Sequence, residues 1–210
     1  MAVICPTITA ETPKVYREQV ARVEPFAERL HIDLADGKFA PTTLLVPAQI
    51  YWPKTVIADL HVMFEEPQRE FETLVSLKPN VVIVHAEAKG DLLGMLLELQ
   101  SYGIKAGLAL LADSAPEAYA KLIGVVDHVL LFAGKLGYQG AQADMHILKK
   151  IPLIKAINPT AELAWDGGIT PENVPLLVEQ GVEVLNVGGY IHTADDPKVA
   201  YESLLKLLSK

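Results

Sequence analysis

Short apolar runs alternate with longer amphipathic segments along the whole chain of 210 residues. The apolar runs are rich in Val, Ile and Leu and end in polar or glycine-containing turns, which is typical of strands buried in a parallel sheet. Eight such strands are predicted, over residues 2–8, 29–36, 55–63, 80–87, 105–111, 128–133, 161–166 and 182–187.

The segments between these strands have the period of amphipathic helices. Helices are predicted over residues 14–27, 67–77, 91–102, 115–125, 143–149, 171–180 and 197–208. Thr170, Pro171 and Glu172 form an N-terminal capping pattern, and Gly103 and Gly181 lie where a helix should end.

The strict alternation of strands and helices predicts a parallel sheet covered by helices. Eight units in 210 residues favour a closed (β/α)8 barrel, the TIM barrel, over an open doubly wound sheet. An open sheet normally has a glycine-rich turn after its first strand, whereas residues 7–11 contain no glycine. Because no linker or charge block divides the chain, residues 1–210 are expected to form a single barrel domain.

Charged and imidazole side chains gather in three of the predicted strands. His31 and Asp33 share one face of the second strand, Asp59 and His61 share one face of the third, and Asp166 ends the seventh. If these strands lie in one barrel, two imidazoles and two carboxylates converge at its mouth, where barrel active sites are assembled. Such nitrogen and oxygen ligands suit one divalent metal ion, Zn²⁺, Fe²⁺, Mn²⁺ or Co²⁺. The carboxylates could also transfer protons.

The other histidines occupy different positions along the predicted elements. His85 closes the fourth strand and is expected near the site. His128 begins a strand and is therefore expected at the opposite end of the barrel. His146 and His192 are expected in surface or loop positions.

Glycine-containing turns follow the last three predicted strands. They contain Gly137, Tyr138, Gln139 and Gly140, then Gly167 and Gly168, and finally Gly188 and Gly189. Backbone N–H groups in such turns can bind phosphate without a basic side chain. The alternative is that these glycines only terminate strands, but their grouping in the last three loops favours a phosphate site.

The composition limits which partners the chain is expected to bind and where in the cell it is expected to be. A net charge of −8 and a pI of about 5.2 argue against binding to nucleic acid or to a membrane surface. No segment has the length of a membrane span, and the N-terminus lacks the features of a secretory signal. The single cysteine, Cys5, excludes an internal disulfide, so a cytoplasmic location is expected and Cys5 is expected to be a small buried hydrophobe.

Several motifs match one known family over nearly the whole length of the chain. The most specific is His-Ile-Asp-Leu-Ala-Asp-Gly-Lys-Phe-Ala-Pro at residues 31–41. Shorter matches are Pro-Thr-Ile-Thr at 6–9, Asp-Leu-His-Val-Met at 59–63, His-Ala-Glu-Ala at 85–88, Asp-Gly-Gly-Ile at 166–169 and Gly-Gly at 188–189. In these motifs and their spacing the chain resembles the ribulose-phosphate 3-epimerases.

This resemblance implies an isomerase with one divalent metal ion held by His31, Asp33, His61 and Asp166. It also implies that Asp33 and Asp166 lie on opposite sides of C3 of D-ribulose 5-phosphate. One aspartate removes the C3 proton and the other returns a proton to the opposite face, so that D-xylulose 5-phosphate forms through an enediolate. The implied partner is a small phosphorylated sugar, contacted by Thr7, His61, Met63 and the three glycine-containing turns. Association into a homo-oligomer is left open.

The chain departs from the family pattern around this core. Thr7 and Gly189 replace serines, Ala35 and Phe132 replace methionines, Thr42 replaces an asparagine, and residues 137–142 replace a glycine-rich loop. These changes alter the lining and the phosphate loops more than the proton-transfer residues. They therefore bear on the identity of the substrate more than on the type of reaction.

Three alternative functions follow from these departures and from related barrels. The first is an epimerase for another ketose phosphate, such as allulose 6-phosphate, and the second is a non-catalytic paralogue that binds a phosphorylated sugar. The third is a carbon–carbon lyase resembling hexulose-phosphate synthases, which rely on an Asp-x-Lys-x-x-Asp motif. Asp33 and Asp36 are present here, but position 35 is Ala35 and not lysine, which argues against the lyase.

Overall fold

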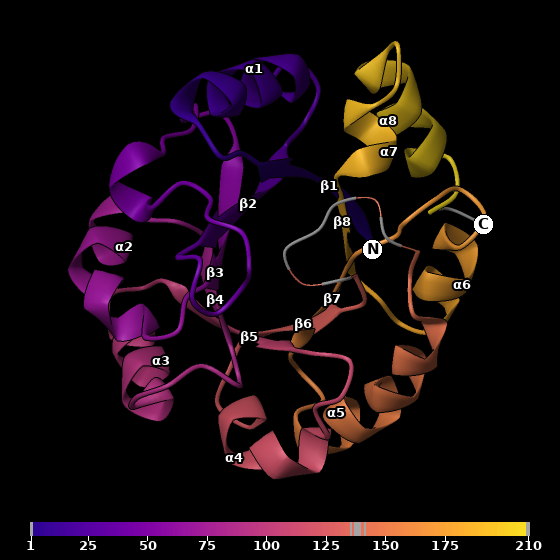
Figure 1. The fold of residues 1–210 in the computed structure, drawn as a ribbon. Helices are drawn as coiled ribbons and strands as arrows, with labels where there is room; N and C mark the ends of the chain where they lie inside the picture. The colour runs from indigo at the N-terminus through magenta and orange to yellow at the C-terminus, as the bar shows by residue number, and fades with distance from the viewer. Residues whose placement is uncertain (1, 135, 137–139, 141, 209–210) are drawn as a thin grey trace.

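A computed structural model describes residues 2–134, 136, 140 and 142–208 of the chain. Within these residues, eight parallel strands close into a barrel in sequence order, and the last strand pairs with the first (Figure 1). The strands are β1 (Val3–Thr9), β2 (Arg29–Ala35), β3 (Ile57–Met63), β4 (Val81–His85), β5 (Lys105–Leu110), β6 (His128–Phe132), β7 (Glu162–Asp166) and β8 (Val184–Val187). The predicted (β/α)8 barrel is confirmed.

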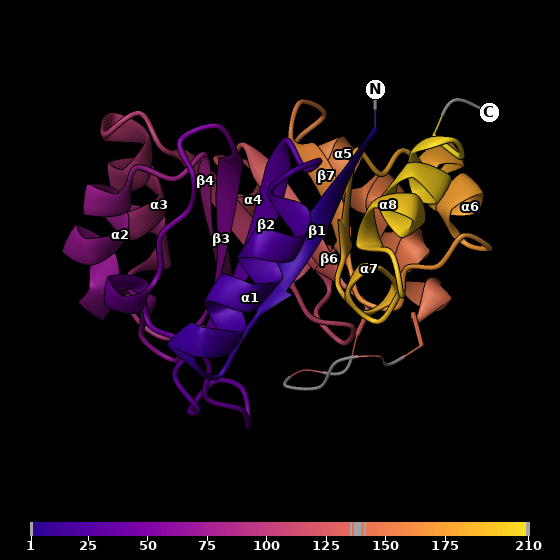
Figure 2. The ribbon, with the colours of Figure 1, turned by 90° about the horizontal axis from the view of Figure 1, so that it is seen from above.

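The helices form a ring around the outside of the strands (Figures 1 and 2). They are α1 (Pro13–Val23), α2 (Phe71–Leu77), α3 (Leu92–Ser101), α4 (Ala120–Ile123), α5 (Ile151–Ile157), α6 (Val174–Glu179), α7 (Gly189–His192) and α8 (Pro197–Leu205). Short 3₁₀ helices cover Pro47–Gln49, Pro67–Glu70, Pro116–Tyr119 and Met145–Lys150. Among the described residues, none of the helices has the length and apolar character that crossing a membrane requires.

Several helices differ from the sequence prediction: the one at 14–27 ends at Val23, and those at 67–77 and 115–125 each begin as a 3₁₀ helix. The helix predicted at 171–180 begins at Val174, because the Asn173 side chain accepts from the Thr170 amide and donates to the Gly168 carbonyl, which closes a separate turn. The helix predicted at 143–149 is a 3₁₀ helix that ends at Lys150, and α5 follows it directly. A proline in the first turn of α5 begins that helix instead of interrupting it.

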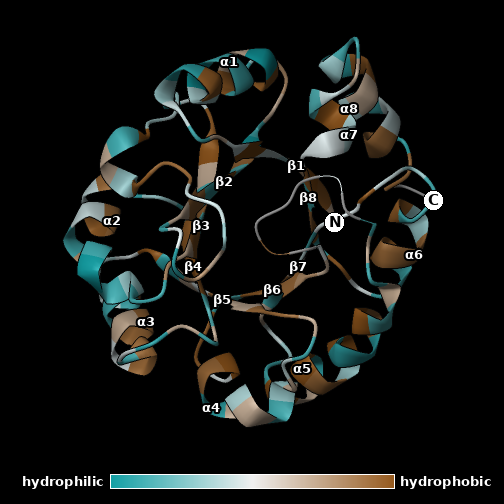
Figure 3. Ribbon diagram, in the orientation of Figure 1, coloured by the Kyte–Doolittle hydropathy of each residue, from teal (hydrophilic) through white to brown (hydrophobic). Residues whose placement is uncertain are grey.

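Alternation along the strands divides the apolar side chains into two groups. Leu30, Ile32 and Leu34 belong to the large core between the strands and the helices. The strand faces that point into the barrel form a separate buried cluster. Its members are Cys5, Val81, Ile83, Ala109, Leu130, Ala164 and Val184. Figure 3 shows mostly hydrophobic strands surrounded by helices of mixed hydropathy. The expected role of Cys5 as a small buried hydrophobe is thereby confirmed.

A network of buried charges closes the amino end of the barrel. Arg29 donates from Nε to Asp59 Oδ2 at 2.6 Å and through its two terminal nitrogens to both oxygens of Glu162, at 3.0 and 2.8 Å. Asn80 donates to the other oxygen of Asp59 at 2.7 Å, and His128 Nδ1 lies 2.8 Å from Glu162 Oε2. This network joins β2, β3, β6 and β7, and it places His128 at the expected end of the barrel.

Replacing Arg29 should therefore destabilise the fold strongly. We expect Arg29→Met to lower the free energy of unfolding by about 3 kcal/mol, because two mostly buried carboxylates lose their cation. Arg69→Met is the control, because Arg69 pairs with Glu66 at 2.6 Å but its side chain is 69% exposed, and such pairs contribute at most about 1 kcal/mol. Urea denaturation measures both losses, and equal losses would contradict a structural role for the network.

The same network predicts a dependence of stability on pH. Burial alone would raise the pKa of Glu162, but hydrogen bonds with His128 and Arg29 outweigh it and hold this pKa well below its ordinary value of 4.5. A carboxylate with a lowered folded pKa stabilises the fold above its unfolded pKa, and this contribution is lost as pH falls through the folded pKa. The unfolding free energy of the wild type should therefore exceed that of Glu162→Gln most above pH 4.5.

Urea denaturation between pH 3 and pH 7 measures this difference. The gap between the two proteins should shrink progressively as pH falls below the ordinary glutamate pKa. Glu117→Gln, which neutralises an exposed carboxylate, controls for the change in net charge. A gap for Glu162→Gln that does not depend on pH would refute the assignment.

Candidate metal centre

Four side chains from three strands meet at the carboxyl end of the barrel. His31 and Asp33 are on β2, His61 is on β3 and Asp166 is the last residue of β7. Asp33 and His61 are direct neighbours in the register of β2 and β3. One ligand atom from each of the four residues lies within 4.8 Å of the others. The two imidazoles and two carboxylates that converge here are thus His31, His61, Asp33 and Asp166.

The separations between these atoms fit a single metal ion. Asp33 Oδ1 lies 2.9 Å from His61 Nδ1 and 3.3 Å from His31 Nε2, and Asp166 Oδ2 lies 3.8 and 3.7 Å from the same nitrogens. Ligands at 2.0–2.2 Å from a tetrahedral ion are separated from one another by about 3.3–3.6 Å. His31 Nε2 is also buried without a hydrogen bond partner among the described residues. The cluster could therefore hold a divalent metal ion.

Hydrogen bonds hold Asp33 in its ionised form. Burial alone would raise its pKa, but the two facing imidazoles, His31 and His61, outweigh burial and lower the pKa of Asp33 well below its usual range. Thr9 donates its hydroxyl to Asp33 Oδ2 at 2.7 Å, so Oδ1 remains directed at the two histidines. Thr9 was not predicted as a site residue, although it shares the predicted strand face of Thr7.

Asp166 has the opposite electrostatic environment. Burial and the negative charge of Asp33 both raise the pKa of Asp166 well above its usual range. The two carboxyl groups therefore differ in the protein without a metal ion, with Asp33 ionised and Asp166 able to hold a proton. The strands β7 and β2 are three steps apart around the barrel, so the two groups approach the centre from different sides.

A third histidine touches the cluster, as expected for His85. Its Nε2 lies 2.9 Å from His61 Nε2 in a buried contact. Burial lowers the pKa of His85 to about 4, so its ring is neutral near pH 7. The ring of Phe39, from the loop after β2, lies against His85 with 4.6 Å between the ring centroids. Phe39 was not predicted as a site residue, although it belongs to the long motif at residues 31–41.

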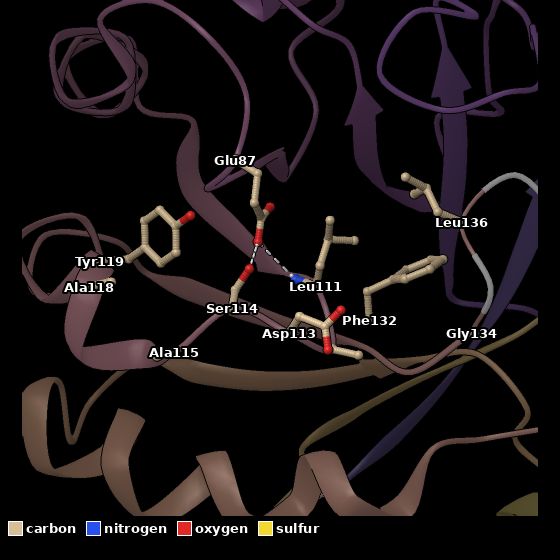
Figure 4. Close-up of a pocket in the computed structure, with 11 residues that line it drawn as sticks. Glu87, Leu111, Asp113, Ser114, Ala115, Ala118, Tyr119, Phe132, Gly134 and Leu136 are labelled. Carbon is tan, nitrogen blue, oxygen red and sulfur yellow. Dashed lines mark hydrogen bonds between the residues drawn. The ribbon is translucent and has the colours of Figure 1, made fainter.

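Apolar side chains line one side of the mouth. Met63 is buried in a small cluster with Ala35, Ala40 and Leu44, against which Phe39 and Leu136 pack. Phe132 lies 6.0 Å from His61 between ring centroids. Phe132 also lines a pocket of about 680 Å³ on the side of β5 and β6, together with Glu87, Asp113 and Ser114 (Figure 4).

The predicted substrate-binding residues lie at several places around this mouth. Thr7 is buried beside His31 in the register of β1 and β2, and a Cβ on Gly188 would lie 3.6 Å from Thr7 Cβ. Gly189 faces open space and begins α7.

The glycines of the two preceding loops are placed differently. Gly167 and Gly168 pack against the backbone of the loop after β6, and Gly140 is exposed. Gly137, Tyr138 and Gln139 lie outside the described residues.

Asp59, a charged residue on one of the three predicted strands, lies away from the candidate metal centre. Asp59 precedes His61 by two residues, a distance of about 7 Å along a strand, and this places it in the network at the amino end. Asp59 shares the predicted inward face of His61, but its partners are Arg29 and Asn80, so it is not one of the carboxylates that converge at the mouth.

The remaining histidines lie away from the cluster. His146 is exposed in the 3₁₀ helix, as expected. His192 follows β8, but the expected surface or loop position was wrong: it ends helix α7, is partly buried, and its Nε2 lies 2.9 Å from the Thr7 carbonyl, which ties α7 to β1.

Fold and site together define a TIM barrel whose carboxyl-end mouth gathers two histidines and two aspartates. The model of the ribulose-phosphate 3 epimerase family matches residues 3–192, and the chain belongs to that family of isomerases. A ribulose-phosphate 3-epimerase of Helicobacter pylori is 31% identical over 185 residues, which are 85% of each chain. One of Bacillus subtilis is 27% identical over 186 residues, covering 85% of this chain and 86% of the relative.

Solved structures extend the likeness of fold. A 3-hexulose-6-phosphate synthase from Salmonella typhimurium matches with a TM-score of 0.74 and 14% identity over 99% of both chains. Identity at this level shows the shared barrel and no more.

The turn after β7 predicts a specific sensitivity to substitution. Gly167 has a φ of 107°, and a Cβ there would collide with the backbone of Gly134. Gly181 has a φ of 90° with nothing within 4 Å of a Cβ. We expect Gly181→Ala to cost about 1 kcal/mol through backbone strain, and Gly167→Ala about 3 kcal/mol because the collision adds to the strain. Urea denaturation compares them, and equal costs would contradict close packing of the two loops.

Proposed function

We propose that the chain is a metal-dependent epimerase that inverts C3 of D-ribulose 5-phosphate to give D-xylulose 5-phosphate. The observation that carries this proposal is the pair of carboxyl groups on β2 and β7, which differ in protonation and lie with two histidines in one cluster. Membership of the ribulose-phosphate 3-epimerase family supports it. The family names the substrate, and the carboxyl pair supplies the acid and base for the reaction.

His31, Asp33, His61 and Asp166 would hold the metal ion, with ligand types that suit Zn²⁺, Fe²⁺, Mn²⁺ or Co²⁺. When bound, such an ion supplies a Lewis acid that stabilises negative charge developing on the ketose oxygens.

Asp33 and Asp166 divide the proton transfers between them. In one direction, an ionised carboxylate removes the proton from C3, and the electron pair of the C–H bond forms the C2–C3 double bond of an enediolate. The other carboxyl group then gives its proton to the opposite face of C3, so the configuration is inverted. The first aspartate ends protonated and the second ionised, which is the arrangement required for the reverse reaction.

The phosphate group would be bound by backbone N–H groups of the glycine-containing turns. Gly167, Gly168, Gly188 and Gly189 follow β7 and β8, where barrels often bind phosphate. We also assign Gly140 and the neighbouring Gly137, Tyr138 and Gln139 to this group, and Thr7 and Met63 to the contacts with the sugar. His61 would serve both as a metal ligand and as a substrate contact.

A second candidate is an epimerase for a longer ketose phosphate, such as allulose 6-phosphate. The pocket of about 680 Å³ beside Phe132 favours it, because a space of this size next to the cluster could accommodate one more hydroxylated carbon. A carbon–carbon lyase is disfavoured because Ala35 stands where that chemistry requires lysine.

Turnover of ribulose 5-phosphate tests the proposal directly. The protein is treated with a chelator, and each of the four metals is restored in turn. We expect activity to disappear and then return with metal, and Asp33→Asn and Asp166→Asn each to lower kcat by roughly 10²–10⁴-fold. Glu117→Gln, which alters an exposed carboxylate outside the cluster and outside the pocket beside Phe132, should retain activity.

Metal-loaded, folded wild type that does not turn over ribulose 5-phosphate would overturn the assignment. Turnover of allulose 6-phosphate in that case would support the second candidate. Binding of phosphorylated sugars without turnover would instead identify a non-catalytic paralogue.

A further inference from the structure

The ring of His61 has two nitrogens with different neighbours. Nδ1 belongs to the four-atom cluster, and Nε2 lies 2.9 Å from Nε2 of His85. Two neutral rings at this distance can share only one proton between the facing nitrogens. The position of the proton on one ring therefore dictates its position on the other.

Metal binding selects one of the two arrangements. If His61 Nδ1 is to bind a metal ion, its proton must lie on Nε2. His85 Nε2 must then accept a hydrogen bond from His61 Nε2–H, so the proton of His85 must lie on its Nδ1. In the other arrangement His61 Nδ1 carries the proton and cannot bind a metal, and His85 Nδ1 presents a lone pair.

Glu87 faces the nitrogen that decides between these arrangements. Its Oε2 lies 3.4 Å from His85 Nδ1, and both atoms are buried with no other polar partner among the described residues. A carboxylate oxygen favours a proton on the facing nitrogen and disfavours a lone pair. Asp33 Oδ1, 2.9 Å from His61 Nδ1, favours the opposite arrangement when no metal ion is bound, so Glu87 is the group that favours the arrangement able to bind one.

The other oxygen of Glu87 is held in place by two donors. Its Oε1 accepts hydrogen bonds from the hydroxyl of Ser114 and from the amide of Leu111, the latter at 3.1 Å (Figure 4). Burial alone would raise the pKa of Glu87, but the facing His85 ring and the hydrogen bonds from Ser114 and Leu111 outweigh burial and lower it. The group facing His85 is therefore an ionised carboxylate in a fixed orientation.

We propose that Glu87 is a positioning residue, which acts through His85 to keep the proton of His61 on Nε2 and thereby leaves Nδ1 free to bind the metal ion. This inference rests on the metal centre of the proposed function. It extends the site by two residues that do not themselves touch the metal ion or the substrate.

Replacement of Glu87 by glutamine reverses the polarity of this contact. The donors from Leu111 and Ser114 would hold the glutamine oxygen at the position of Oε1, which directs its amide N–H₂ at His85 Nδ1. His85 would then carry its proton on Nε2 and force the proton of His61 onto Nδ1. Glu87→Ala leaves His85 Nδ1 open to water, which can accept a hydrogen bond from an N–H at that position.

The order of metal affinities is the decisive result. We expect Glu87→Gln to weaken Zn²⁺ binding about 100-fold and Glu87→Ala only about 10-fold. A side chain that acted only by filling space would give the reverse order, because glutamine nearly matches glutamate in shape. Asp113→Asn makes the same chemical change at an exposed acid of the same pocket and should leave the affinity unchanged.

Zn²⁺ affinity is measured by competition with a chromophoric chelator, and circular dichroism checks that each variant is folded. The ¹⁵N spectrum of the histidine rings in the Zn²⁺-loaded wild type should show protons on His61 Nε2 and His85 Nδ1. A proton on His85 Nε2, or Glu87→Gln binding Zn²⁺ as tightly as the wild type, would overturn the inference. Failure of the wild type to bind Zn²⁺, Fe²⁺, Mn²⁺ and Co²⁺ would overturn the metal centre itself.

Discussion

The mutual repulsion of two buried carboxyl groups is the constraint on which the site depends. Asp33 and Asp166 have oxygens within 4.8 Å of each other inside the barrel. Both cannot be ionised there without compensation, because repulsion between like charges is strong where water is excluded. The facing histidines lower the pKa of Asp33, whereas burial and the charge of Asp33 raise the pKa of Asp166, so a proton on Asp166 would relieve the repulsion. A bound cation would neutralise both groups together.

The barrel separates this charge from a second buried network. Asp59 and Glu162 are paired with Arg29 at the amino end, whereas the site at the carboxyl end has imidazoles as its nitrogen groups. Between the two ends lies the apolar interior cluster around Ile83 and Leu130. The charges at the amino end are paired with one another and stabilise the fold. The nitrogens at the carboxyl end are left available to bind a ligand.

Most of the architecture could be predicted from local patterns. The strands lie within a few residues of their predicted bounds, because a buried parallel strand needs a short apolar run whatever its neighbours are. Two helices were less predictable. α5, which has Pro152 in its first turn, directly follows a 3₁₀ helix, and α6 begins only after a turn closed by Asn173. In both segments a local feature, the Asn173 side chain or Pro152, favours one of two local structures, and hydrophobic periodicity does not distinguish between them.

Sequence alone determined which residues face into the barrel, because alternation along a strand follows from backbone geometry. It thereby identified His31, Asp33, His61 and Asp166 as inward groups. Alternation does not say at which height along the barrel axis each inward residue lies, or which strand brings a partner to it. Only barrel closure and strand register separated Asp59 from His61 and set Glu87 beside His85, since these depend on contacts between residues distant in the chain.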